Sequence, residues 1–280
     1  MQAQRHRARL VPSKDQIVRS IKAERRATLS LLRGLDHAAF DTPTALPGWR
    51  IREVIAHLIT TDRAALTGSI LPAIFLAGST DKVEAWNERQ VPRWAKRSVP
   101  DLVIGLDRWG RRFARFAATV PSPVYRPTLP SPWGRGPLAL YVWVRTYDEW
   151  VHRQDMRRAL GMGDEDVDVE GAAEFLLTAI GFQTIHQLDR AKGQLAIELQ
   201  GAALPQWTFD LTSKAFGPNG ATGGSADPTT ASTRISAPAA AFIMASAGRD
   251  SFEDLTSKGI VRVEGDEDAG RRFLSKLRIV

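Results

Sequence analysis

The chain has 280 residues, of which 43% are hydrophobic and 25% charged, a composition typical of a folded globular protein of about two domains. Its net charge is +7, but the basic residues are scattered, which favours anionic small molecules over nucleic acid as partners. The absence of cysteine excludes disulfides, a thiolate nucleophile and a cysteine-based zinc site. No apolar run approaches the ~18 residues that span a bilayer, and the N-terminus lacks the apolar part of a secretory signal. We therefore expect a cytoplasmic protein with no membrane contact.

Four amphipathic helices are predicted in the first 120 residues, at about 14–34, 50–66, 81–97 and 101–119. Ser13 and Gln16 fit a capping box at the start of the first helix. The second helix carries an apolar stripe spaced i, i+3, i+4, i+7 and i+8, made of Ile51, Val54, Ile55, Leu58 and Ile59. His57 lies at the edge of that stripe, where a single histidine is more often a packed core residue than a ligand.

Three segments around these helices need separate interpretation. The apolar segment 67–80 is broken by glycine and proline, and it either lines the mouth of a pocket or packs as a loop on the helices. The helix at 101–119 has a polar side that is either a solvated face or the source of a cation for a substrate carboxylate. That side carries Arg108, Arg111, Arg112 and Arg115. Residues 120–137 contain six prolines and are predicted to form an extended connection.

The segment 138–161 is predicted to form one helix, which starts after Pro137 and stops at Gly161. A polar row projects from one face of this helix, because its members are spaced 3, 4 and 3 residues apart. The row consists of Arg145, Asp148, His152 and Asp155. An apolar stripe runs beside it, so the charged groups should lie at the edge of the core or inside it, where they need partners or a metal ion.

Two interpretations of this row remain open. Asp148 and His152 form an i, i+4 pair that can converge on one metal ion, with Glu149 as a rival carboxylate at i, i+3 from His152. Alternatively, Arg145 and Asp148 form an ion pair and His152 is merely packed, since ion-pair networks are common.

Strands mixed with helices are predicted in the rest of the chain. An acidic loop at 163–170 leads into an apolar helix that reaches about residue 186. Alternating apolar residues predict strands at 193–200, 206–213, 232–236 and 260–263, with a Gly-rich loop at 217–224. Helices are predicted at 238–247 and 266–277. This change of character indicates a second, α+β domain, so the domains are predicted at 13–162 and 170–280.

Two stretches, TPTALPGWRIREVIAHL (42–58) and RTYDEWVHRQDMRRALG (145–161), resemble the mycothiol-dependent maleylpyruvate isomerase family. The resemblance implies an α+β fold, in which an N-terminal DinB-like four-helix bundle binds a divalent metal and a smaller C-terminal domain resembles the sterol carrier proteins. The strand before Glu264-Gly265-Asp266 and the helix after it carry the second likeness. The implied metal ligands are His57, Asp148 and His152, and zinc is the implied ion. The family usually has Glu where this chain has Asp148.

The resemblance implies a metal-dependent enzyme that uses mycothiol, a low-molecular-weight thiol, for isomerisation of, or transfer to, a small electrophilic or carboxylate substrate. The thiol must be external because the chain has no cysteine. Arg145 is expected to pair with a substrate carboxylate or with Asp148, and Asp155 to orient His152 or to pair with Arg158. Two alternatives remain: a non-catalytic, metal-stabilised protein that binds a small ligand, and a metal-dependent hydrolase or transferase that needs no thiol.

Overall fold

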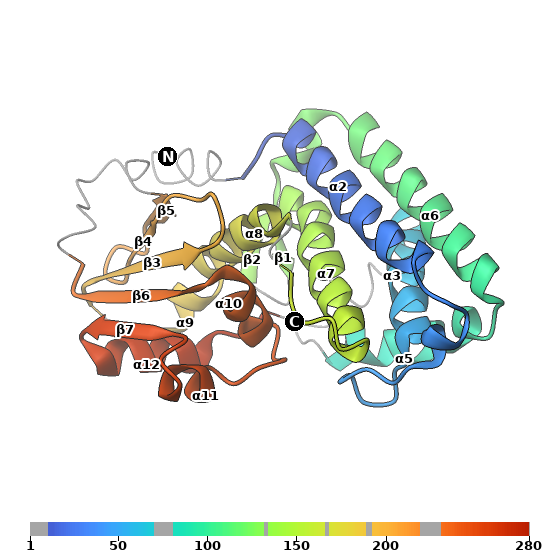
Figure 1. The fold of residues 1–280 in the computed structure, drawn as a ribbon. Coiled ribbons are helices and arrows are strands. Elements are labelled where there is room, and N and C mark those ends of the chain that lie inside the picture. Colours follow the sequence, from blue (N-terminus) through green and yellow to red (C-terminus); the bar gives the residue numbers. More distant parts are fainter. Residues whose placement is uncertain are drawn as a thin grey trace. The chain divides into compact units, whose positions relative to one another are not determined.

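The computed structural model describes residues 11–69, 81–131, 134–165, 168–188, 192–218 and 231–279. The chain divides into two compact units, one formed by Pro12–Pro132 and Gly136–Asp164 and the other built mainly from Glu165–Val280. The first unit is helical, and the second combines a five-stranded sheet with helices (Figure 1), so the predicted α+β class is confirmed. Among the described helices, none combines the length and the apolar character needed to cross a bilayer.

Four long helices form the bundle of the first unit. They are α2 (Lys14–Arg33), α3 (Ile51–Thr67), α6 (Val99–Thr119) and α7 (Leu138–Ala159). Helices α2 and α3 each pack against both α6 and α7, which closes the bundle around a shared apolar core. A fifth helix, α5 (Asp81–Ala95), packs against α3, and the short 3-10 helix η1 (Ala38–Asp41) lies in the loop before α3.

The ends of these helices follow local sequence signals. The Ser13 hydroxyl accepts a hydrogen bond from the Gln16 backbone N–H, and the Gln16 side chain accepts one from the Ser13 N–H, so the predicted capping box is present. The Ser98 hydroxyl caps α6 by accepting a hydrogen bond from the backbone N–H of Asp101. Helix α3 ends at Gly68, whose φ of 71° lies in the left-handed region that favours glycine.

The connection between α6 and α7 is more structured than predicted. It contains the 3-10 helix η2 (Ser122–Tyr125) and a two-stranded ladder of β1 (Thr128–Ser131) and β2 (Gly134–Pro137). The Tyr125 hydroxyl donates a 2.6 Å hydrogen bond to the carbonyl of Ala117 and so fastens this turn to the end of α6. The prolines of 120–137 exclude a long helix, but a single turn and a short ladder need few consecutive backbone donors.

The sheet of the second unit is mixed, with the strand order β5-β4-β3-β6-β7. The strands are β3 (Gln194–Gln200), β4 (Trp207–Asp210), β5 (Phe216–Pro218), β6 (Thr233–Pro238) and β7 (Arg262–Gly265). Only the β3–β6 pair is parallel among the described pairings of this sheet; the other three pairs are antiparallel. The helices of this unit are α8 (Val169–Phe182), α9 (Thr184–Gln187), α10 (Ala239–Ser246), α11 (Phe252–Ser257) and α12 (Glu267–Lys276).

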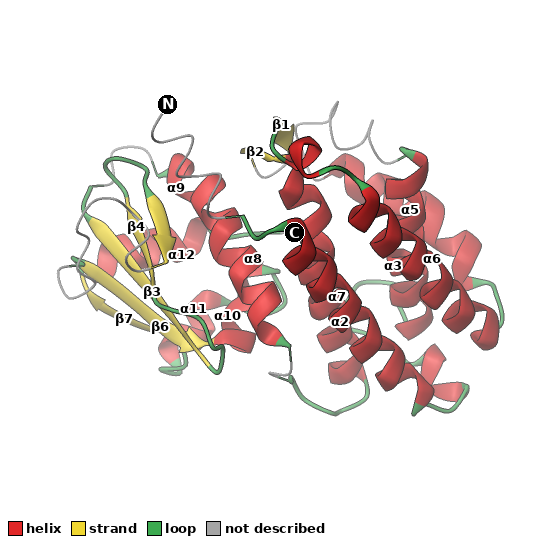
Figure 2. Ribbon diagram, turned by 90° about the horizontal axis from the view of Figure 1, so that it is seen from above, coloured by secondary structure: helices red, strands yellow, loops and turns green. Residues whose placement is uncertain are grey.

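One face of this sheet is covered by helices (Figure 2). Phe209 and Phe216 are paired across β4 and β5, and their rings stack on that face. Phe216 contacts Phe182 of α8, and Phe209 contacts Phe273 of α12, so both helices lie against the same face. Burial alternates along β6, as expected for a strand covered on one side.

Three details of the second unit differ from the sequence predictions. Strand β5 occupies the start of the predicted Gly-rich loop, and the short helix α11 was not predicted. The predicted helix to residue 186 is two helices, because the backbone breaks at Gln183. The remainder of the Gly-rich loop, and the segment 70–80, lie outside the described residues.

Candidate metal centre

The three expected ligands meet at the inner faces of two helices. His57 comes from α3, and Asp148 and His152 come from α7 at i, i+4 spacing. The Nε2 atoms of His57 and His152 lie 3.6 Å and 3.5 Å from the same oxygen, Oδ1 of Asp148. One donor atom from each residue falls within a group whose members are all within 4.8 Å of one another. The structure therefore brings together the His57, Asp148 and His152 set predicted from the sequence.

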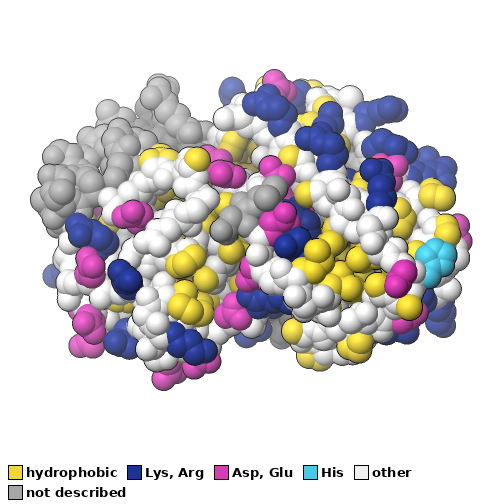
Figure 3. Space-filling model, in the orientation of Figure 1, with side chains coloured by type: hydrophobic (Ala, Val, Ile, Leu, Met, Phe, Trp, Pro, Cys, Tyr) yellow, Lys and Arg dark blue, Asp and Glu magenta, His cyan; other side chains and the backbone are white. Residues whose placement is uncertain are grey.

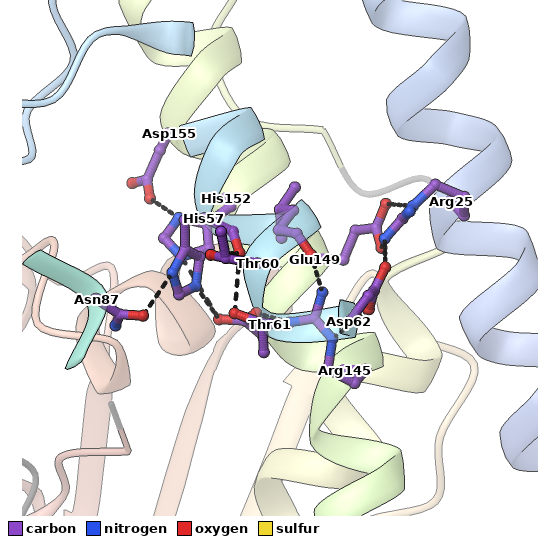
Figure 4. Close-up of polar contacts among 12 residues, drawn as sticks. Arg25, His57, Thr60, Thr61, Asp62, Asn87, Arg145, Glu149, His152 and Asp155 are labelled. Atoms are coloured by element: carbon purple, nitrogen blue, oxygen red, sulfur yellow. Dashed lines mark hydrogen bonds and ion pairs between the residues drawn. The ribbon is translucent and has the colours of Figure 1, made fainter. Parts of the chain in front are cut away.

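Each imidazole is oriented by a hydrogen bond at its other nitrogen (Figure 4). Nδ1 of His57 lies 3.2 Å from Oδ1 of Asn87 on α5, and Nδ1 of His152 lies 2.9 Å from Oδ2 of Asp155. Both partner atoms are acceptors, so each Nδ1 is the donor, and a neutral ring would leave the lone pair of its Nε2 available to a metal ion. Of the two roles left open for Asp155, the structure shows the contact with His152.

Burial and charge set the protonation states that a metal ion needs. Burial is the largest influence on His57, and it lowers the pKa of this imidazole despite the raising effect of Asp148, which favours the neutral form. Burial alone would raise the pKa of Asp148, but the Arg145 guanidinium, the strongest of the opposing influences, holds the pKa far below its ordinary value. Asp148 is therefore a carboxylate at neutral pH. Its side chain is 26% exposed, against 9% for each histidine, so the site is open to solvent on the side of Asp148.

The donor set fits a divalent cation. Zinc bound tetrahedrally at ordinary N and O distances would place neighbouring donor atoms roughly 3.4 Å apart. The two separations between Nε2 and Asp148 Oδ1, 3.6 and 3.5 Å, are close to that edge length. Two neutral imidazoles and one carboxylate also form an open donor set, which leaves at least one position for another ligand.

An indole ring lies beside the two histidines. The ring centre of Trp49, which precedes α3, is 5.3 Å from that of His57 and 6.3 Å from that of His152. The two imidazole rings lie 4.8 Å apart in an edge-to-face arrangement. Trp49 also packs against the cluster of Ala56, Val91 and Ala95, so it joins the candidate site to the apolar contact between α3 and α5.

Arg145 and Glu149 each have buried partners. Of the two partners considered for Arg145, the structure shows Asp148; Arg145 also pairs with Asp62 of α3 at 3.0 Å. Glu149, the rival carboxylate, is 2% exposed and pairs with Arg25 of α2 at 2.6 Å. Glu149 therefore projects to a different part of the bundle from His57 and His152.

Sequence reasoning missed three residues near the site: Arg25, Asp62 and Asn87. Two of them carry a recognisable signal, since each occupies a position that continues an apolar stripe. Arg25 lies four residues from both Ile21 and Leu29 on α2. Asp62 follows Leu58 by four residues on α3. A charged residue in line with core positions indicates a buried ionic contact. No such signal marks Asn87.

The arginines of α6 belong to a solvated face. Arg108, Arg111, Arg112 and Arg115 all lie on the solvent side of the helix, none of them buried, and basic side chains are numerous over α2 and α6 in Figure 3. Arg111 pairs with Asp107 at 2.6 Å, and the Arg112 guanidinium lies 4.8 Å from the ring centre of Trp109. These contacts support the solvated-face interpretation of this helix.

Fold and site together define a helical bundle in which two histidines and one carboxylate form a site that suits a metal ion, in one chain with an α+β unit. Residues 21–157 match the family model described as the mycothiol maleylpyruvate isomerase N-terminal domain. These residues therefore form a domain of the mycothiol-dependent maleylpyruvate isomerase family.

Solved structures agree with the fold. A crystal structure of the mycothiol-dependent maleylpyruvate isomerase aligns with a TM-score of 0.55 and 17% identity, over 86% of this chain and 91% of that chain. A histidine-to-alanine mutant of that isomerase aligns with the same TM-score and 16% identity, over 90% of this chain and 93% of the other. No curated protein matches the chain significantly in sequence.

Proposed function

We propose that this protein is a metal-dependent enzyme that uses mycothiol for isomerisation of, or transfer to, a small electrophilic substrate. One observation carries the proposal: two oriented Nε2 atoms face the same oxygen of an ionised carboxylate, in a domain of the maleylpyruvate isomerase family. Zinc is the proposed ion, since two imidazoles and one carboxylate form one of its catalytic donor sets.

The residues of the chain supply binding and orientation. His57, Asp148 and His152 would hold the ion, while Asn87 and Asp155 keep the imidazole lone pairs directed at it. A bound divalent cation lowers the pKa of a coordinated thiol and so supplies a thiolate near neutral pH. The chain needs an external thiol for such chemistry because it has no cysteine.

Of the two roles expected for Arg145, we propose the pairing with Asp148 over the binding of a substrate carboxylate. Its side chain is 4% exposed and its guanidinium is held by Asp62 and Asp148. Recruiting it to a substrate carboxylate would break its ion pairs with Asp148 and with the buried Asp62, which is costly. We therefore propose that Arg145 supports Asp148, and that another group recognises the substrate.

Titration calorimetry with mycothiol tests the proposal. Zinc-loaded protein should bind mycothiol, more tightly as pH rises toward the pKa of the thiol, because coordination releases a proton. Metal-free protein should give no comparable heat. Turnover of an electrophile panel that includes maleylpyruvate should need both zinc and mycothiol. Metal-independent binding, or zinc-dependent turnover without the thiol, would instead support a ligand-binding protein or a thiol-independent hydrolase or transferase.

A further inference from the structure

A series of buried ion pairs runs from Arg145 into the bundle (Figure 4), and Arg145 also pairs with Asp148. Arg145 donates from Nη1 to Oδ2 of Asp148 and from Nε to Oδ1 of Asp62, the latter at 3.0 Å. Oδ2 of Asp62 accepts from Nη2 of Arg25 at 2.8 Å. Arg25 also donates to both oxygens of Glu149, at 2.6 and 2.8 Å. We call Asp148, Arg145, Asp62, Arg25 and Glu149 the ion chain.

The ion chain involves all four long helices of the bundle. Arg25 belongs to α2, Asp62 to α3, and the other three members to α7. Helix α6 contributes backbone: the carbonyl of Leu106 accepts from Nη1 of Arg25, and a Cβ at Gly110 would collide with the Arg25 guanidinium. The absence of a side chain at Gly110 thus makes room for the central arginine.

The two oxygens of Asp148 face different groups. Oδ1 lies toward the two Nε2 atoms, whereas Oδ2 is occupied by Arg145. Only Oδ1 of Asp148 would therefore be available to a metal ion held by the two histidines. Asp62 is 1% exposed and lies between two guanidinium groups, so it balances the charge of Arg145 and fixes its position.

Stability alone does not explain the ion chain. Apolar residues of similar volume often stabilise a protein core as well as, or better than, buried ion pairs. Four of the five members are buried, and the fifth is a candidate metal ligand. The ion chain therefore points to a role at the candidate metal centre, where the position and the charge of Asp148 must be controlled.

We propose that Asp62 is a positioning residue for the metal centre. Through Arg145 it holds Asp148 as a ligand that binds through one oxygen, which keeps further coordination positions open for thiol and substrate. This proposal rests on the proposed metal centre. It assigns no contact with metal or substrate to Asp62 itself.

Zinc affinity and cobalt absorption test the proposal on the full chain. Asp62→Asn leaves the Arg145 cation unbalanced near the site and should weaken zinc binding at least about tenfold. Arg145→Gln removes that cation and should not weaken zinc binding. It should release Oδ2 to the metal, so the visible absorption of bound Co²⁺ should fall as the coordination number rises above four. The double variant should return to within about threefold of wild-type affinity, because Asp62 acts through Arg145.

Glu24→Gln is the matched control. Glu24 is 1% exposed and pairs with Arg153, so this variant also removes a buried carboxylate that links α2 to α7. It should lower stability but leave zinc affinity and the cobalt spectrum unchanged. Variants are compared only where circular dichroism shows a folded protein. If Asp62→Asn does not fold, the cobalt spectrum of Arg145→Gln decides the question.

The outcomes distinguish failure of the proposed metal centre from failure of the proposed role of Asp62. If wild-type protein binds no zinc, the proposed metal centre is wrong and the role of Asp62 falls with it. If wild-type protein binds zinc, three results would overturn the role of Asp62 alone. The first is a folded Asp62→Asn protein with wild-type zinc affinity, and the second is a double variant as weak as Asp62→Asn. The third is an Arg145→Gln protein with the wild-type cobalt spectrum.

Discussion

Within the described residues, every buried charged side chain belongs to the helical unit, whereas the buried polar residues of the second unit are uncharged. The charged set consists of Glu24, Arg25, Asp62, Arg145, Glu149, Arg153 and Asp155, and the same unit also buries the titratable side chains of His57 and His152. The uncharged set consists of Thr178, Thr184, Thr208, Thr233 and Ser246. Burying a charge is costly unless it is paired, so the helical unit accepts a cost that the second unit avoids.

This difference shows that the two units are stabilised in different ways. The sheet is covered by aromatic rings such as Phe209 and Phe216, whose burial is favourable without any exact charge balance. The bundle has an apolar core as well, but Arg25 and Asp62 interrupt it at positions that lead to Asp148. The unit with the candidate site is thus the one in which a single lost charge should have the larger consequences.

The largest expected effect concerns the metal. Wild-type protein should hold about one divalent ion per chain, and His57→Ala or His152→Ala should lose it, because each removes one of three donors. Elemental analysis after gel filtration measures the stoichiometry. Phe216→Ala, in the second unit, is the control and should retain the metal. Stoichiometric metal in both histidine variants would show that the ion lies elsewhere.

A loss of stability of about 3–5 kcal/mol is expected for Phe209→Ala, since it removes a fully buried ring between β4 and α12. Denaturant unfolding followed by circular dichroism measures this change, while zinc affinity should stay at the wild-type value. Ile260→Ala alters a side chain that is 38% exposed and should change stability by less than about 0.5 kcal/mol. Lower zinc affinity in Phe209→Ala would contradict the contrast between the units.

A smaller effect is expected at Gly110, which contacts Arg25 without belonging to the ion chain. Gly110→Ala introduces a methyl group where the guanidinium lies, and Arg25 cannot simply move because Asp62 and Glu149 hold it. Overpacking should cost about 1–3 kcal/mol, although alanine favours the helix. Thermal unfolding is the measurement. Gly105→Ala is the control, because its added methyl group would meet the ring of Trp94 and not Arg25. Equal shifts in zinc affinity for Gly110→Ala and Gly105→Ala would show that displacing Arg25 has no special effect on the metal site.

The smallest effect belongs to the second unit and depends on pH. Asp210 accepts hydrogen bonds from the backbone N–H groups of Thr212 and Ser213, at 2.8 and 3.0 Å. Burial is the largest single influence and raises the pKa of Asp210, but the bonds from Ser213 and Thr212, together with the Lys214 cation, outweigh it and lower the pKa below the ordinary 3.8. The stabilisation is therefore complete above pH 3.8 and is lost as pH falls through the lower pKa of the folded state.

Solvent screens this partly exposed group, so Asp210→Asn should cost under about 1 kcal/mol near neutral pH. Unfolding of both proteins between about pH 7 and about pH 2.5 measures the difference. The gap should close at the acidic end. A gap that widens toward low pH would show that the carboxylate is not the stabilising form.

Much of the site is encoded in the spacing along single helices. Helical periodicity predicts the polar row of α7 and the position of His57 at the edge of the α3 stripe. The family resemblance then assigned His57, Asp148 and His152 to one metal site. Periodicity assigns a residue to a face but does not say which faces of different helices meet. The contact of Asp62 with both Arg25 and Arg145 depends on how three helices cross, so it could not be predicted from spacing. The ladder of β1 and β2 was not predicted, because proline cannot donate a hydrogen bond to a strand ladder and so argues against strands in this segment.

The central claim is that Asp148, and not its neighbour Glu149, completes the metal centre, and titration of zinc into metal-free protein tests it most directly. Asp148→Asn should weaken zinc binding far more than Glu149→Gln. Glu149→Gln should instead cost about 3–5 kcal/mol of unfolding free energy, because it leaves Arg25 with one buried partner fewer. If Glu149→Gln abolished zinc binding while Asp148→Asn retained it, the ligand set would be wrong by one residue along α7.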